Sequence, residues 1–189
     1  MAVLRPRIWL TWLCLWLVLA VLATGSARAH AAPSEYQVKA VFLFNFAQFV
    51  DWPAEAFPRP DAPFVIGVLG QDPFGSQLDN VVRGETVNNR TLVVERYRSV
   101  AEIRNCNILF IGGNESGHLD EILMALKGRS ILTVGDADPA GQRGVMIQLV
   151  NENNRIRLRI NVAAAKAGNL TISSKLLRPA EIVGGSGEG

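Results

Sequence analysis

The sequence predicts a single α/β domain whose mostly parallel sheet is covered by helices on both faces. Four short apolar segments alternate with helical ones, and their apolar runs are continuous rather than alternating. These segments are 64–70, 92–96, 107–111 and 130–134. Strands that are apolar on both sides are typical of a parallel sheet with two covered faces. The roughly 160 residues that follow an export signal are enough for one domain with a real core.

The first thirty residues are expected to be an export signal. Arg5 and Arg7 precede the uncharged apolar run 8–22, and Ala27-Arg28-Ala29 is a small-x-small cleavage site. This layout is typical of a secretory signal peptide; the alternative, a retained anchor, needs a longer apolar run of about 20 residues. The predicted boundaries are 1–30 for the signal peptide, 31–180 for the domain and 181–189 for a flexible tail.

Removal of the signal changes the charge balance. Three of the 19 Lys and Arg residues precede the cleavage site, and all 17 Asp and Glu residues follow it. The exported chain therefore carries 16 basic and 17 acidic residues, a net charge of −1. Such a chain has no net positive field to attract nucleic acid or anionic lipid.

Helices are expected between the apolar segments. The first should run from Glu35 to Asp51, with Ser34 as N-cap and Pro53 beyond its end. A second should start near Asp72-Pro73, with Asp72 as N-cap and Pro73 at its first position, and end before Gly84. Further helices are expected over 99–104, 116–127 and 162–167, with another short segment over 172–177.

A change of pattern after Gly144 predicts a C-terminal antiparallel hairpin at one edge of the sheet. Segment 145–150 and the strictly alternating segment 155–160 are joined by an Asn-rich turn. Arg155, Arg157 and Arg159 then share one face. Charge of this kind commonly guards an exposed edge. A binding patch for an acidic partner is the alternative interpretation.

Few residues in the exported chain could carry catalytic chemistry. Cys106 is its only cysteine and adjoins an apolar run, so we expect a buried structural thiol. His118 has no neighbour at metal-ligand spacing, and the motifs of a nucleophilic triad are absent. Asp136 and Asp138 follow the fourth strand, where carboxylates can be catalytic or can cap a turn. We therefore predict no enzyme activity, metal or cofactor.

A crevice for a small ligand is a second possibility at the carboxyl ends of the strands. Gly70, Gly112 and Asp136 are its candidate residues. Neither glycine belongs to a complete nucleotide-binding fingerprint, so tight strand-to-helix turns are the simpler explanation for them.

The first helix is unusually aromatic, and a helical wheel divides it into two faces. The face expected to cover the sheet comprises Phe42, Leu43, Phe46, Ala47, Phe49 and Val50. The opposite, mixed face comprises Val41, Phe44, Asn45, Gln48, Asp51 and Trp52. Large apolar groups among polar ones are covered either by the protein's own chain or by a partner. The mixed face is therefore the candidate partner-binding site.

The same helix closely resembles the signature of the YfiR/HmsC-like family, the DUF4154 domain. The matching residues are Lys39, Ala40, Phe42, Leu43, Asn45, Phe46, Val50, Trp52 and Pro53. Further matching blocks follow in family order at 68–75, 106–111, 131–136, 143–147, 160–165 and 172–177. The resemblance extends over about 34–178.

The resemblance implies a non-enzymatic periplasmic regulator that binds and represses a membrane-bound diguanylate cyclase. The implied partner is the periplasmic domain of an inner-membrane GGDEF protein, and the output is cyclic-di-GMP and biofilm formation. An OmpA-like outer-membrane lipoprotein can sequester such repressors, and members can form homodimers. Some members carry paired cysteines that tune stability, whereas Cys106 stands alone here. A periplasmic small-ligand sensor is the alternative function.

Overall fold

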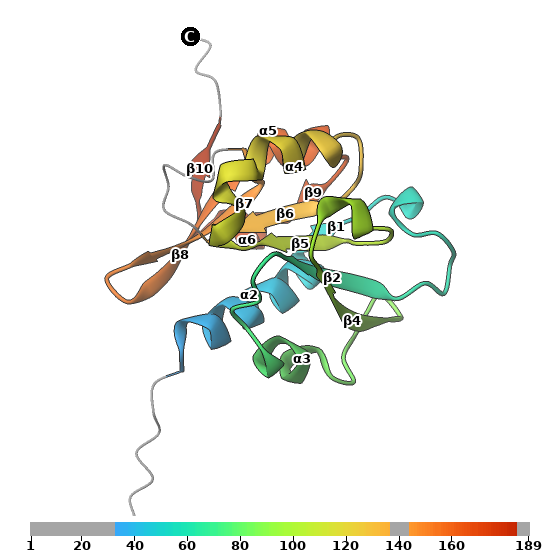
Figure 1. Ribbon diagram of the computed structural model, residues 1–189, viewed down its shortest axis with the longest axis horizontal. Coiled ribbons are helices and arrows are strands. Elements are labelled where there is room, and N and C mark those ends of the chain that lie inside the picture. Colours follow the sequence, from blue (N-terminus) through green and yellow to red (C-terminus); the bar gives the residue numbers. More distant parts are fainter. Residues whose placement is uncertain (1–32, 137–143, 185–189) are drawn as a thin grey trace, which may run out of the picture. The chain divides into compact units, whose positions relative to one another are not determined.

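A computed structural model describes residues 33–136 and 144–184, all within one compact unit (Figure 1). Its main sheet has eight strands in the order β10-β8-β7-β6-β5-β2-β4-β3. The strands are β2 Phe64–Leu69, β3 Thr86–Val87, β4 Arg90–Tyr97, β5 Ile108–Ile111, β6 Leu132–Gly135, β7 Ile147–Glu152, β8 Arg155–Asn161 and β10 Glu181–Val183. Strands β4, β2, β5, β6 and β7 run parallel, which confirms the predicted mostly parallel sheet.

Helices cover both faces of this sheet, as predicted. The helices are α2 Glu35–Phe49, α3 Ser76–Val82, α4 Leu119–Ala125, α5 Val162–Ala167 and α6 Ser174–Leu177. In Figure 1, α2 and α3 lie below the sheet and α4 lies above it. Alternate strand residues explain the two layers: Ile108 and Phe110 join the core under α2, whereas Leu109 and Ile111 join the core under α4.

The C-terminal hairpin forms at one edge of the sheet, as predicted, and a short additional strand covers part of it. Strands β7 and β8 pair antiparallel, and Asn153 and Asn154 at the turn have φ values of 51° and 62°. Strand β10 then adds parallel to β8 at residues 159–161. Strand β10 therefore covers only one end of β8, and its residues Glu181–Val183 had been predicted to belong to the flexible tail.

The first helix ends two residues earlier than predicted. Val50 and Asp51 form strand β1, which pairs antiparallel with β9, Thr171–Ile172. The amide of Ser173 also donates to the carbonyl of Phe49, at 2.9 Å. A β-branched residue close before Pro53 favours extended backbone, and the distant segment supplies its hydrogen bonds. Ser34 caps the helix as predicted, in a capping box with Gln37.

The predicted N-cap role of Asp72 was wrong. Its Oδ1 accepts from the amides of Phe74 and Gly75, so Asp72 stabilises a turn and α3 begins only at Ser76. Asp72 and Asp79 both pair with Arg96 of β4. Short 3₁₀ helices are also present: η1 Ala54–Ala56, η2 Val100–Glu102 and η3 Gly113–His118. Only η2 forms where a helix was predicted over 99–104. The η3 helix replaces the first turn of the helix predicted from residue 116.

Candidate functional site

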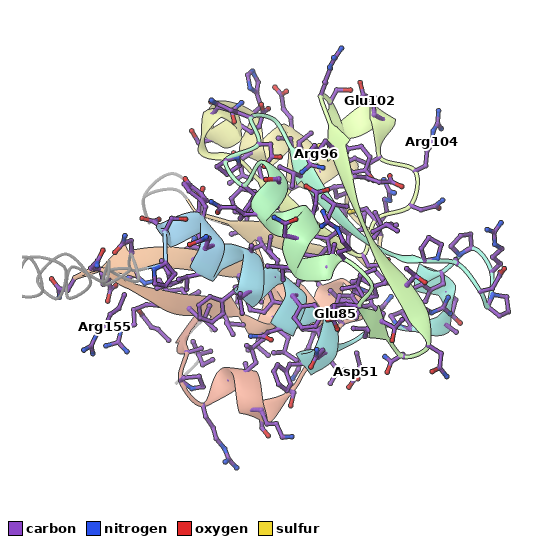
Figure 2. All side chains as sticks on the ribbon, turned by 90° about the horizontal axis from the view of Figure 1, so that it is seen from below. Asp51, Glu85, Arg96, Glu102, Arg104 and Arg155 are labelled. Atoms are coloured by element: carbon purple, nitrogen blue, oxygen red, sulfur yellow. The ribbon has the colours of Figure 1, made fainter. Side chains whose placement is uncertain are left out.

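The outer face of α2 exposes only part of the predicted mixed face. Val41 has 46% of its surface exposed, which makes it one of three exposed large apolar residues among the described residues. Gln48 is exposed and Asn45 is half-buried on the same helix. Asp51 is exposed just beyond the helix, in β1 (Figure 2). These four residues are the accessible part of the candidate site.

Phe44 and Trp52 also belong to the protein's own packing. Both are half-buried against the core under α2. Trp52 stacks edge-to-face on Phe64 with ring centroids 4.8 Å apart, and its Nε1 donates to the carbonyl of Asn107 at 3.2 Å. Trp52 lies after β1 and not on the helix. The predicted mixed face is thus partly exposed to solvent and partly packed against the protein's own core.

The predicted core face of α2 is buried along its centre and partly exposed at one side. Leu43, Phe46, Ala47 and Val50 are buried, as expected from the helical wheel. Phe42 and Phe49, which lie together on the wheel, are only partly buried. The apolar surface that α2 presents therefore extends around this side of the helix as well.

The three predicted crevice residues divide between two places. Gly70 and Gly112 lie together, because a Cβ on either would be within 3.0 Å of Asn114 Oδ1. That oxygen accepts from the amide of Gln71 at 3.1 Å, and Glu115 lies equally close to Gly70. The chain's own side chains therefore occupy the space beside these two glycines. Gly70 has a φ of +86°, which explains the need for glycine there.

Asp136 belongs instead to a buried charged cluster. Lys39 of α2 is only 1% exposed, and its Nζ lies 3.1 Å from Asp136 Oδ2. The ammonium also pairs with Glu35 and lies 4.9 Å from the centre of the Tyr36 ring. Burial, together with Asp136, raises the pKa of Tyr36 to about 12. Asp138, the other predicted carboxylate, lies outside the described residues.

Sequence reasoning missed this cluster, although a signal for it existed. Lys39 falls on the core side of the helical wheel, between Leu43 and Phe46. A lysine at a core position needs buried partners, because an unpaired charge there is costly. Its main partner lies 97 positions along the chain. The cluster joins the first turns of α2 to the carboxyl end of β6.

Glu35 makes this cluster sensitive to acid. Its hydrogen bond with Lys39 lowers the pKa of Glu35 below its ordinary value of 4.5, and Asn151 Nδ2 adds a hydrogen bond of 2.6 Å. The resulting stability is present above pH 4.5 and is lost as the pH falls through the lower folded value. We expect Glu35→Gln to flatten the pH dependence of the urea midpoint below pH 5. An unchanged profile would contradict this.

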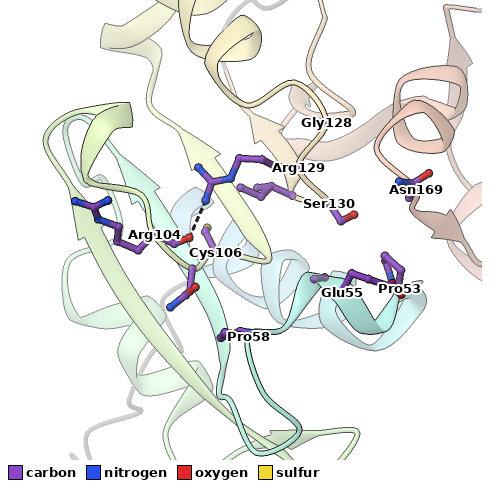
Figure 3. A pocket seen from close by; sticks show the side chains of 12 residues that line it. Pro53, Glu55, Pro58, Arg104, Cys106, Gly128, Arg129, Ser130 and Asn169 are labelled. Atoms are coloured by element: carbon purple, nitrogen blue, oxygen red, sulfur yellow. Dashed lines mark hydrogen bonds between the residues drawn. The ribbon is translucent and has the colours of Figure 1, made fainter.

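A hollow of about 710 Å³ lies near the amino-terminal ends of β5 and β6, whereas Asp136 follows the carboxyl end of β6 (Figure 3). Four separate chain segments line it: 53–58, 104–106, 128–131 and Asn169. Arg129 donates to the carbonyls of Ile103 and Arg104 and so holds two of these segments together. Figure 3 shows the Ser130 side chain directed into the hollow and the Arg104 guanidinium directed away from it. The size is within the range of small-molecule sites.

Cys106 borders this hollow but is buried. Its Sγ lies 3.0 Å from the carbonyl of Ile108, and burial raises the pKa of the thiol to about 12. The prediction of a buried structural thiol is confirmed. At pH 8 almost none of the thiol is ionised, and only the thiolate reacts with alkylating agents.

We therefore expect Cys106 to resist iodoacetamide at pH 8 in the folded protein and to react fully in 6 M guanidinium chloride. Mass spectrometry of the intact chain would measure the modification. Rapid labelling under native conditions would contradict this expectation. The urea midpoint should also be the same with and without dithiothreitol, since the thiol has no cysteine partner among the described residues.

Together these features define an α/β domain with a partly apolar exposed face on α2 and a buried ion-pair cluster. Within the described residues, no group of three His, Cys, Asp or Glu side chains could hold a metal ion, and no helix is long and apolar enough to cross a membrane. The model of the family described as YfiR/HmsC-like (DUF4154) matches residues 36–181. The chain therefore belongs to the YfiR/HmsC-like family. The chain matches no curated protein.

Membership in this family has a general functional consequence. YfiR-like proteins are regulatory rather than catalytic, and the family implies a periplasmic regulator of diguanylate cyclase. The matched range includes Val41, Asn45, Gln48 and Asp51, and it includes the Lys39 cluster except Glu35.

Proposed function

We propose that this protein binds the periplasmic domain of an inner-membrane GGDEF protein and represses its diguanylate cyclase activity. Membership in the YfiR/HmsC-like family is the observation that carries the proposal. The export signal predicted over 1–30 lies outside the described residues and is part of the same proposal. The accessible α2 surface, formed by Val41, Asn45, Gln48 and Asp51, is the proposed contact with the cyclase.

The chemistry of this surface suits a reversible protein contact. An exposed Val contributes apolar area that a partner can bury, and fully burying such a side chain is worth about 1.5 kcal/mol or more. The neighbouring amide and carboxylate groups can form the polar rim of an interface. Repression then follows if the protein binds the inactive conformer of the cyclase more tightly than the active one.

Deletion of the gene tests the proposed output. With the cognate cyclase gene intact, loss of the repressor should raise cellular cyclic-di-GMP and biofilm mass, and expression of the wild-type chain should restore both. An unchanged cyclic-di-GMP level would contradict repression. Deletion of both genes should return cyclic-di-GMP to the level of the cyclase deletion alone.

A single substitution tests the proposed surface. Val41→Asp places a charge on the outer face of α2, so we expect binding to the cyclase domain to weaken at least about tenfold with little change in the urea midpoint. Met124→Asp is the matched control, because Met124 is 76% exposed on α4, across the sheet from α2. Calorimetric titration of the purified domain with both variants measures the effect. Equal affinities for the two variants would place the contact elsewhere.

Phe44→Asp and Trp52→Asp are less suitable tests. Both side chains pack against the core, so a charge at either position should also lower stability. Loss of repression in these variants would therefore not distinguish a lost contact from partial unfolding.

Two further contacts belong to the same proposal. An OmpA-like outer-membrane lipoprotein would relieve repression by sequestering the protein, which removes it from the cyclase by mass action. A homodimer is the proposed oligomeric state. Sedimentation of the purified chain over a range of concentrations tests the dimer separately from the regulatory proposal.

A small-ligand sensor is a second candidate, and the hollow near the amino-terminal ends of β5 and β6 is the observation that favours it. The crevice predicted from the sequence beside Gly70 and Gly112 is filled by the side chains of Asn114 and Glu115. The hollow therefore offers more space for a ligand than that crevice. A screen of periplasmic metabolites for an increase in the melting temperature tests this function. A hit whose effect is abolished by Ser130→Trp, which would fill the hollow, supports it.

A further inference from the structure

The outer half of the C-terminal hairpin has an open backbone edge. Strand β8 begins at Arg155, but β10 pairs only with residues 159–161. Among the described residues, no strand pairs with the outer side of residues 155–158. Figure 1 shows this end of the hairpin projecting beyond the rest of the sheet. The geometry is that of an edge strand which can accept another strand.

The hydrogen-bond pattern identifies which groups face outward. The amide of Asn161 donates to the carbonyl of Met146, at 2.8 Å. Because antiparallel bonding alternates, residues 155, 157 and 159 bond to β7, whereas the amides of Ile156 and Leu158 point away from it. The same alternation places the Ile156 and Leu158 side chains in the core under α2. The three arginine side chains of β8 therefore lie on the opposite face.

These arginines differ sharply in their partners. Arg159 is half-buried and pairs with both Glu181 and Glu152, at 2.8 Å and 3.3 Å. Arg155 and Arg157 are exposed, and neither forms an ion pair with any described residue. Figure 2 shows Arg155 directed away from the body of the domain. Glu152 and Glu181 thus both pair with Arg159 and with neither of the other two arginines of β8.

A hollow beside the open edge adds a third cation. Its volume is about 340 Å³, and Arg157 and Arg178 line it together with Glu152 and Glu181, the two glutamates that pair with Arg159. Arg178 is exposed at the end of α6 and has no ion pair within the described part of the chain. The exported chain has a net charge of −1, so this local excess of positive charge is a feature of the site and not of the whole molecule.

We infer that the open edge of β8 binds an extended acidic segment of a partner protein. The segment adds as a strand beside residues 155–158, in line with β10, and hydrogen-bonds to the outward backbone groups of Ile156 and Leu158. Arg155 and Arg157 are two residues apart on a strand, so their side chains are spaced about 7 Å apart. Acidic side chains at alternate positions of an extended peptide have the same spacing. Arg178 receives a further carboxylate at the hollow. This inference does not depend on the cyclase being the partner.

Protein is favoured over an anionic membrane as the occupant. An edge with unsatisfied backbone donors and acceptors selects another backbone, which a lipid headgroup does not provide. Guanidinium groups also match the planar geometry of carboxylates. A membrane, or a simple charged guard against self-association, remains as a distinct outcome of the experiment below.

Fluorescence anisotropy of labelled peptides tests the inference. The probe is an eight-residue peptide of alternating glutamate and threonine, and the comparison peptide has glutamine in place of glutamate. We expect the purified protein to bind the glutamate peptide with an affinity that falls as salt rises, and to bind the glutamine peptide at least about tenfold more weakly. Arg157→Glu combined with Arg178→Glu should weaken binding of the glutamate peptide by about tenfold or more.

The control carries the same change of charge at a distance from the edge. Arg83→Glu combined with Arg98→Glu alters two exposed arginines and should leave binding within about twofold. Ile156→Pro tests the backbone contact, since it removes an outward amide and keeps every amide of β8 that faces β7. Urea unfolding shows whether the variant folds. If it does not fold, the two arginine pairs still decide the question.

Several results would overturn the inference. These are no binding of the glutamate peptide, equal binding of both peptides, or equal weakening by the two arginine pairs. Sedimentation with phosphatidylglycerol vesicles that depends on Arg157 and Arg178, without peptide binding, would instead indicate a membrane contact. Self-association of the Arg157→Glu, Arg178→Glu protein without peptide binding would indicate that these arginines only guard the edge.

Discussion

Lys39→Met is expected to lower the free energy of unfolding by about 3 kcal/mol, because it leaves the buried Asp136 carboxylate without its cation. The Asp136 side chain is only 7% exposed, so water cannot replace the lost ammonium. Urea unfolding followed by circular dichroism measures the change. A loss below about 1 kcal/mol would show that the Lys39–Asp136 contact is of little importance to stability.

A double-mutant cycle separates the ion pair from simple packing. Asp136→Asn alone should also be destabilising, although less so, because Glu35 still pairs with Lys39. The double variant Lys39→Met, Asp136→Asn removes both charges, so its loss should be smaller than the sum of the single losses by about 2 kcal/mol. Full additivity would contradict a direct interaction between the two groups.

An exposed ion pair provides the matched control for this cycle. Arg59 and Asp61 lie 2.9 Å apart, but their side chains are 67% and 80% exposed. Asp61→Asn should therefore change the free energy of unfolding by less than about 0.5 kcal/mol. The contrast between the two pairs would isolate the effect of burial, since both join a basic group to an aspartate.

Trp52→Ala is the second change with a large expected effect, a loss of about 3 kcal/mol of stability. The substitution removes the edge-to-face contact with Phe64 and the hydrogen bond to the carbonyl of Asn107. Trp52 follows the small sheet of β1 and β9, so its loss loosens the link between the end of α2 and the main sheet. Urea unfolding again measures the change.

Trp52→Phe distinguishes the two contributions. It keeps an aromatic ring near Phe64 but removes the indole donor. The Asn107 carbonyl still accepts from the amide of Leu132 at 2.8 Å, so no buried acceptor is left without a partner. The expected loss is therefore only about 1 kcal/mol. A loss equal to that of Trp52→Ala would show that the hydrogen bond, and not the ring packing, dominates.

The central strands were predictable because their signal is local. Continuous apolar runs placed β2, β5 and β6 within two residues of their observed ends, and the Asn-rich turn located the β7–β8 hairpin. Strands of two or three residues have no such periodicity. Val50–Asp51 and Glu181–Val183 are strands only because Thr171–Ile172 and β8 supply their partners. The same limitation explains why Glu181–Val183 were expected to belong to the tail.

The candidate site was predictable in outline only. The helical wheel identified Val41 and Gln48 as outward residues, and both are exposed. It could not show that Trp52 leaves the helix and hydrogen-bonds to a residue 55 positions away. Nor could it show that Asp136, expected to line an open crevice, is held by Lys39. Each difference involves a partner that is distant in the sequence.

The sequence by itself determined the family, the α/β class and the order of the central elements, because these follow from short-range patterns of apolar residues, turns and caps. Only the tertiary structure decided which polar groups meet. In the folded protein, Lys39 pairs with Asp136, and Glu152 and Glu181 both pair with Arg159. Residues 155–158 of β8 have no neighbouring strand on their outer side among the described residues. Burial and ion pairing depend on segments that folding brings together. Such contacts between distant residues cannot be read from local patterns in the sequence.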